Sequence, residues 1–123
     1  MSGDNFILDT NIVLLLLNGD KTLSNLLDGK NLYLSFITEI ELLGYHKISK
    51  KEKQEIKRFI DDCIVIDMNN DIKQHVIDIR IKYNPKLGDC FIAGTVLYAE
   101  LPFITSDKGF NKMNELNLIY YNR

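Results

Sequence analysis

Four acidic residues stand where apolar, strand-like segments give way to helical ones. They are Asp9, Glu41, Asp89 and Asp107. Carboxylates gathered in a dry cleft repel one another, so they need a proton or a cation to neutralise them. Oxygen ligands of this kind select Mg²⁺ or Mn²⁺ over zinc. Such ions can activate a bound water and offset the charge that grows on a phosphate, which suits hydrolysis of a phosphodiester bond.

Each acid also has a purely structural interpretation. Asp9 and Asp89 could cap the helices that follow them, and Asp107 could begin a turn. Glu41 could be a solvent-exposed helix residue, and composition alone makes Glu39 its equal as a candidate. Four acids on one edge of one sheet favour a shared site over four separate caps. Neighbouring polar side chains could orient the acids or a metal-bound water; these are Thr10, Asn11, Thr105 and Ser106.

Strand-like and helix-like segments alternate along the chain. Strands are predicted over residues 6–8, 32–35, 64–66, 103–105 and 118–121. Helices are predicted over residues 12–17, 21–27, 38–45, 70–83, 91–99 and 110–116, with a further one that Ser49 caps. This alternation predicts a three-layer α/β/α fold with a mostly parallel, four- to five-stranded sheet. Because no repeat or linker is visible, residues 1–123 are expected to form a single domain.

The binding edge of such a sheet lies beyond the carboxyl ends of its strands. Asp9 directly follows the first predicted strand, and Asp107 follows the fourth. The strand assignments alone therefore place these two acids at that edge. Glu41 lies early in the helix after the second strand, and Asp89 is expected to cap a buried helix. The fold must bring these two residues to the same place.

Composition limits the class of protein. The chain has 123 residues, of which 46% are hydrophobic and 26% charged, enough to bury a core and remain soluble. A net charge of −2 argues against a protein that coats nucleic acid, but not against a nuclease with an acidic pocket and a basic rim. No apolar run reaches the roughly 18 residues of a membrane span. The absence of a basic leader and of metal-type cysteine spacing predicts a cytoplasmic protein.

Four motifs share a characteristic order and spacing. They are Leu8-Asp9-Thr10-Asn11, Thr38-x-x-Glu41-Leu42 followed by Gly44, Asp89-x-x-Ile92-Ala93, and Leu101-Pro-Phe-Ile-Thr105-x-Asp107-x-x-Phe110. Together they resemble the PIN domain family, especially the small VapC-type toxins of toxin–antitoxin pairs. The resemblance covers essentially the whole chain. It favours Glu41 over Glu39, because the family's acid precedes a leucine after Thr-x-x.

The resemblance implies a Rossmann-like sheet and a metal-dependent ribonuclease. The four acids would bind Mg²⁺ or Mn²⁺, with Asn11 and Thr105 as supporting polar groups. It further implies an RNA substrate, a homodimer and a cognate antitoxin that blocks the acidic pocket, often with a basic side chain. Two other functions stay open: a PIN-like binding module without catalysis, and a receiver-like or phosphatase-like Mg²⁺-binding domain. The second expects a lysine beside a phosphorylated aspartate, for which Lys108 is the near candidate.

Overall fold

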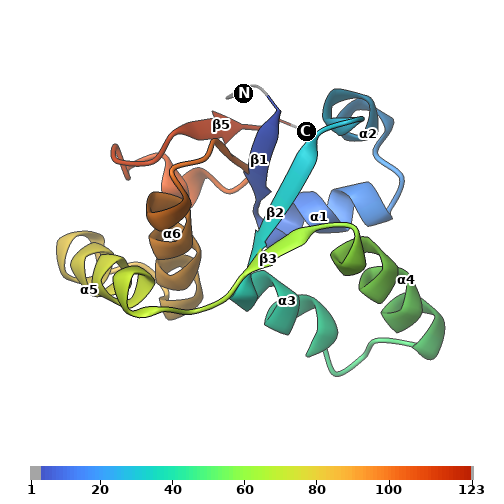
Figure 1. The fold of residues 1–123 in the computed structure, drawn as a ribbon, viewed down its shortest axis with the longest axis horizontal. Helices are drawn as coiled ribbons and strands as arrows, with labels where there is room; N and C mark the ends of the chain where they lie inside the picture. The colour runs from blue at the N-terminus through green and yellow to red at the C-terminus, as the bar shows by residue number, and fades with distance from the viewer. Residues whose placement is uncertain (1–3, 123) are drawn as a thin grey trace.

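The structure, a computed structural model, describes residues 4–122 and contains within them one parallel sheet (Figure 1). Its strands are β1 (Asn5–Leu8), β2 (Asn31–Ser35), β3 (Ile64–Ile66), β4 (Phe103–Thr105) and β5 (Leu118–Tyr120). They lie in the order β3-β2-β1-β4-β5, and every neighbouring pair is parallel. Residues 1–3 and 123, which the predicted single domain includes, lie outside the described residues.

Helices cover both faces of the sheet. They are α1 (Thr10–Leu17), α2 (Lys21–Leu27), α3 (Phe36–Leu43), α4 (Lys50–Asp61), α5 (Asn70–Tyr83) and α6 (Leu87–Ala99). Figure 1 shows α5 and α6 on one side of the central strands, with α1, α2 and α4 on the other. The predicted three-layer α/β/α fold is therefore confirmed, and all five expected strands are present in the described part of the chain.

Two hydrophobic clusters form the core, one on each face of the sheet. Successive residues of β1 divide between them, since Ile7 packs with the α5 and α6 cluster and Leu8 with the α1, α2 and α4 cluster. Phe103 and Ile104 of β4 divide in the same way. All four side chains are buried. Strands buried on both faces explain why these segments are uniformly apolar instead of alternating.

Three helices begin earlier than predicted, and the first of them, α1, begins at Thr10 after its Asp9 cap instead of at residue 12. The third helix was expected to open at Thr38, but α3 begins at Phe36, where the Ser35 hydroxyl accepts a hydrogen bond from the Ile37 N–H. The expectation that Asp89 caps a helix is wrong, because α6 begins at Leu87 with no side-chain cap. Asp89 instead occupies its first turn, where a carboxylate favours the positive end of the helix dipole. The predicted Ser49 cap is confirmed, and Glu52 completes a capping box with it at the start of α4.

The helix predicted over residues 110–116 is also wrong. The segment has one short 3₁₀ helix, Lys108–Phe110, followed by turns. Its buried side chains, Phe110, Met113 and Leu116, recur every three residues. Backbone bonds from the Met113 N–H to Phe110 and from the Leu116 N–H to Met113 have the same spacing. Three residues per turn is the period of 3₁₀ geometry, so the pattern was mistaken for an α-helix.

Within the described residues, none of the helices combines the length and the apolar character needed to span a bilayer.

Candidate active site

Asp9 is the most buried of the four candidate acids, with 5% of its surface exposed. It directly follows β1 and caps α1, and its backbone N–H donates to the Ile104 carbonyl at 2.9 Å. One carboxylate oxygen accepts from the Thr10 N–H at 2.8 Å, and the other accepts from the Thr105 hydroxyl at 2.6 Å. Burial raises the pKa of Asp9 from 3.8 to about 6, against the opposing effect of these two hydrogen bonds. The charges of Asp89 and Asp107 raise it further.

Glu41 reaches the site from α3. The Thr10 hydroxyl lies 2.6 Å from Glu41 Oε1 and 3.0 Å from Thr38 Oγ1. Because this hydroxyl has a single proton, it donates to the charged oxygen of Glu41. The carboxylate is thereby held against the first turn of α1, one residue beyond Asp9. The structure thus places Glu41, and not Glu39, in contact with Thr10.

Asp89 and Asp107 complete the group. Burial raises the pKa of Asp89, and the charges of Asp107 and Glu41 raise it further, while Lys86 lowers it. Asp107 caps the 3₁₀ helix, and its Oδ1 accepts from the Gly109 N–H at 2.8 Å. A Cβ at Gly109 would lie 3.1 Å from that oxygen, so the small residue leaves the carboxylate room. The charge of Asp89 therefore interacts with all three other acids, and that of Asp107 also with Asp9, at one edge of the sheet.

A directed chain of hydrogen bonds joins two of these acids. The Asp107 N–H donates to Thr105 Oγ1 at 3.0 Å, and the Thr105 hydroxyl donates to Asp9 Oδ2. Thr105 is fully buried, so its proton has a fixed acceptor. Asn11 makes a weaker contact, with its Oδ1 3.5 Å from the Ser106 N–H. The strongest supporting contacts thus come from Thr10 and Thr105.

Two further residues of the site were not predicted as part of it. Thr38 is buried and contacts Thr10, which extends the polar network into α3. It stands one helical turn before Glu41 on the same face, a spacing that could have identified it. Lys86 acts on Asp89 from the residue that precedes α6. Its position three residues before an acid was the only available signal.

The donor set fits a hydrated hard cation. In the described chain, the ion pairs join Lys30 to Asp4 and Lys82 to Glu115, so neither neutralises a candidate acid. No three His, Cys, Asp or Glu side chains of residues 4–122 form a ready-made coordination sphere. Mg²⁺ characteristically binds one or two carboxylates directly and keeps several waters. Separated carboxylates that repel one another, two of them with a raised pKa, are compatible with that mode of binding.

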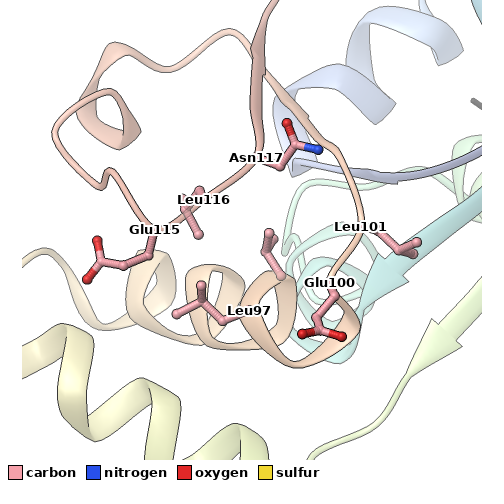
Figure 2. Close-up of a pocket in the computed structure, with 7 residues that line it drawn as sticks. Leu97, Glu100, Leu101, Glu115, Leu116 and Asn117 are labelled. Carbon is pink, nitrogen blue, oxygen red and sulfur yellow. The ribbon is translucent and has the colours of Figure 1, made fainter. Parts of the chain in front are cut away.

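A separate cavity of about 270 Å³ lies at the opposite edge of the sheet. Figure 2 shows that its lining comes from the end of α6 and from the segment before β5. The labelled residues are Leu97, Glu100, Leu101, Glu115, Leu116 and Asn117. None of the four candidate acids lines it, so this cavity is not part of the acidic site.

Comparisons with known proteins agree with this geometry. The sequence model of the PIN domain family matches residues 6–116. A toxin–antitoxin complex from Klebsiella pneumoniae has a TM-score of 0.77 at 24% identity, covering 92% of this chain and 94% of that one. VapBC2 from Rickettsia felis, bound to a promoter DNA fragment, has a TM-score of 0.84 at 17% identity, covering 96% and 99%. VapBC-1 from nontypeable Haemophilus influenzae has a TM-score of 0.76 at 25% identity, covering 94% and 97%. Comparison with curated protein sequences finds no match.

Proposed function

The chain belongs to the PIN domain family, and we propose that it is a metal-dependent endoribonuclease, the toxin of a toxin–antitoxin pair. The observation that carries this proposal is the group of four carboxylates, in which burial and the charges of neighbouring acids raise the pKa of both Asp9 and Asp89. The structural relatives include toxin–antitoxin complexes, which supports the biological role. Residues 1–123 act in this proposal as one cytoplasmic nuclease domain.

We assign the metal ligands of this nuclease to the acids Asp9, Glu41, Asp89 and Asp107. Bound Mg²⁺ or Mn²⁺ would supply an activated water and offset the charge on the scissile phosphate. The role of this chain's own residues is to hold the carboxylates in fixed orientations for the ion. Thr105 and Thr10 fix both oxygens of Asp9, and the Thr10 hydroxyl orients Glu41. Asn11 ties the start of α1 to the segment after β4.

An apolar groove beside the acids supports the proposal that an antitoxin binds this protein. A cavity of about 310 Å³ has Thr10 and Glu41 in its lining. Apolar side chains supply much of the rest: Leu14, Leu42, Tyr45, Ile48 and Ile56. A partner segment with apolar side chains for the groove and one basic side chain for the acids would match this surface and block the site.

The homodimer belongs to the same proposal, supported by the exposed Ile77 and Ile81 of α5.

The test is cleavage of purified transfer, ribosomal and messenger RNA with Mg²⁺ or Mn²⁺, and again with a chelator. Glu41→Gln and Glu39→Gln form a matched pair on one helix, because each removes one charge. We expect cleavage to stop in chelator and to fall on the order of 100-fold in Glu41→Gln, with Glu39→Gln near wild type. Undiminished cleavage in chelator, or an equal loss in Glu39→Gln, would refute the assignment. No cleavage and no divalent-ion binding by calorimetry would instead indicate a binding module.

A further inference from the structure

Two buried hydroxyls join the helices that carry Glu41 and Asp89. Ser35 and Thr95 are 1% and 0% exposed, and their hydroxyl oxygens lie 3.0 Å apart. Ser35 ends β2 and caps α3, while Thr95 lies in the second half of α6. Neither residue touches the acidic site itself. Their bond therefore connects two helices that each present one of the candidate metal ligands.

The direction of this bond follows from counting protons. The Thr95 hydroxyl donates to the Phe91 carbonyl at 2.8 Å, which uses its single proton. The bond to Ser35 must then receive its proton from Ser35. Ser35 Oγ in turn accepts from the Ile37 N–H at 3.2 Å. One directed chain thus runs from the Ile37 N–H through Ser35 and Thr95 to the Phe91 carbonyl.

This bond sits at similar distances from the two acids. Glu41 stands six residues after Ser35 and Asp89 six residues before Thr95, which is about 9 Å along each helix. The two helices also meet through Phe36 and Phe91, whose rings are 5.6 Å apart in an edge-to-face contact. The Glu41 side chain reaches α6, because a Cβ at Gly88 would lie 3.8 Å from Glu41 Oε2.

Apolar contacts alone would not fix the separation of Glu41 from Asp89. Ring packing tolerates small tilts, whereas a buried, directed hydrogen bond does not. A tilt of about 10° over a 9 Å arm moves its end by about 1.5 Å. Catalytic groups must be held within about 0.5 Å of their working positions. The Ser35–Thr95 hydrogen bond and the Phe36–Phe91 ring contact attach α3 to α6 at two points, and together they oppose the tilt that would change the separation of Glu41 from Asp89.

We propose that Ser35 and Thr95 are positioning residues, whose hydrogen bond sets the separation of Glu41 from Asp89 and thereby the affinity of the site for a divalent cation. This inference rests on the proposed metal-dependent nuclease. It assigns no contact with substrate or ion to either hydroxyl.

Thr95→Val and Thr95→Ser test the proposal in opposite directions. Valine keeps the shape of threonine and loses the hydroxyl, while serine keeps the hydroxyl and loses the methyl group. We expect calorimetry to show Mn²⁺ affinity reduced about 10-fold or more in Thr95→Val, and near wild type in Thr95→Ser. RNA cleavage by Thr95→Val should lose kcat with little change in KM. If only packing matters, serine is the more damaging change, and that ranking would overturn the proposal.

The double variant Ser35→Ala/Thr95→Val guards against a folding artefact, since it leaves neither hydroxyl without its partner. Its loss of Mn²⁺ affinity should equal that of Thr95→Val plus only the effect of losing the Ser35 cap on α3, because both variants break the same Ser35–Thr95 bond. If the double variant loses as much affinity as Ser35→Ala and Thr95→Val lose separately and in sum, the proposal is overturned. Wild-type affinity in the double variant would also overturn it. Thr22→Val, at an exposed position in α2, makes the same chemical change away from the site and should bind Mn²⁺ as wild type does.

A wild-type protein that neither binds Mn²⁺ nor cleaves RNA would refute the proposed function together with this inference. Normal wild-type binding with normal binding by Thr95→Val would refute the inference alone.

Discussion

Replacing Asp9 with asparagine should make the metal-free protein more stable at pH 8 while it abolishes RNA cleavage. The folded-state pKa of Asp9 is raised from 3.8 to about 6, chiefly by burial. An acid with a raised folded-state pKa binds its proton more tightly in the folded chain than in the unfolded one. The free energy of unfolding therefore falls as pH rises from about 4 to about 6. Above about pH 6 the full destabilisation by the charged Asp9 is present.

The size of the effect follows from the same shift. A rise from 3.8 to about 6 corresponds to about 3 kcal/mol of unfolding free energy above pH 6. Asparagine removes this cost, but it has only one oxygen for two donors, the Thr10 N–H and the Thr105 hydroxyl. One donor then lacks an acceptor, which costs about 1 kcal/mol. The net expectation for Asp9→Asn is a gain of about 2 kcal/mol at pH 8. At pH 4 only the loss of about 1 kcal/mol remains.

Urea unfolding followed by circular dichroism, in chelator from pH 4 to pH 8, measures this difference directly. Taking the difference between the two proteins at each pH cancels the titration of the acids that do not interact with Asp9, and leaves that of Asp9 with its neighbours Asp89 and Asp107. Asp67→Asn, at an exposed position just after β3 and outside the helices, is the matched control and should stay within about 0.5 kcal/mol of wild type. Saturating Mn²⁺ should stabilise the wild type alone, by about 2.7 kcal/mol at 100 times its dissociation constant. If Asp9→Asn is less stable than wild type at pH 8, the burial argument is wrong.

Two other substitutions test the surroundings of the site. Thr105→Val removes a hydrogen bond that lowers the pKa of Asp9, so the acidic limb of the pH–rate profile should move to higher pH; an unchanged limb would contradict this. Gly94→Ala places a Cβ 2.5 Å from Val76 Cγ2, 3.1 Å from the Val76 backbone nitrogen and 3.2 Å from the Ile72 carbonyl oxygen, where α5 and α6 pack. It should lower the unfolding free energy in urea by about 1–3 kcal/mol, and Val76→Ala should restore only part of this, since the backbone contacts persist. Wild-type stability in Gly94→Ala would show that the two helices separate freely.

The fold was largely predictable because its strands are short apolar runs with clear boundaries. Buried strands such as β1 and β4 have no polar face to confuse the pattern. The errors fell where apolar spacing has two interpretations, as in residues 110–116, whose three-residue period fits a 3₁₀ segment. They also fell at helix starts such as Leu87, where no side chain caps the helix and the sequence carries no signal.

The site was predictable only in its residue types and its edge of the sheet. The strand ends placed Asp9 and Asp107, but composition could not separate Glu41 from Glu39. In the structure Glu41 is the one that the Thr10 hydroxyl meets, a contact between residues 31 positions apart. The burial of Asp9 likewise depends on strand β4, which the local sequence around residue 9 does not reveal. Long-range packing, and not local pattern, fixes the charges and contacts of these acids.

The pairing of β1 with β4 has a consequence for how the protein is made. The two residues of the Asp9–Thr105 hydrogen bond are separated by 96 positions, with most of the chain between them. At about 5–20 residues per second, roughly 5–20 s pass between their syntheses on the ribosome. Through that interval Asp9 lacks the strand that buries it and the hydroxyl that holds it. If Asp9 is a metal ligand, as proposed, the nuclease would stay inactive on its own ribosome until β4 emerges and pairs with β1.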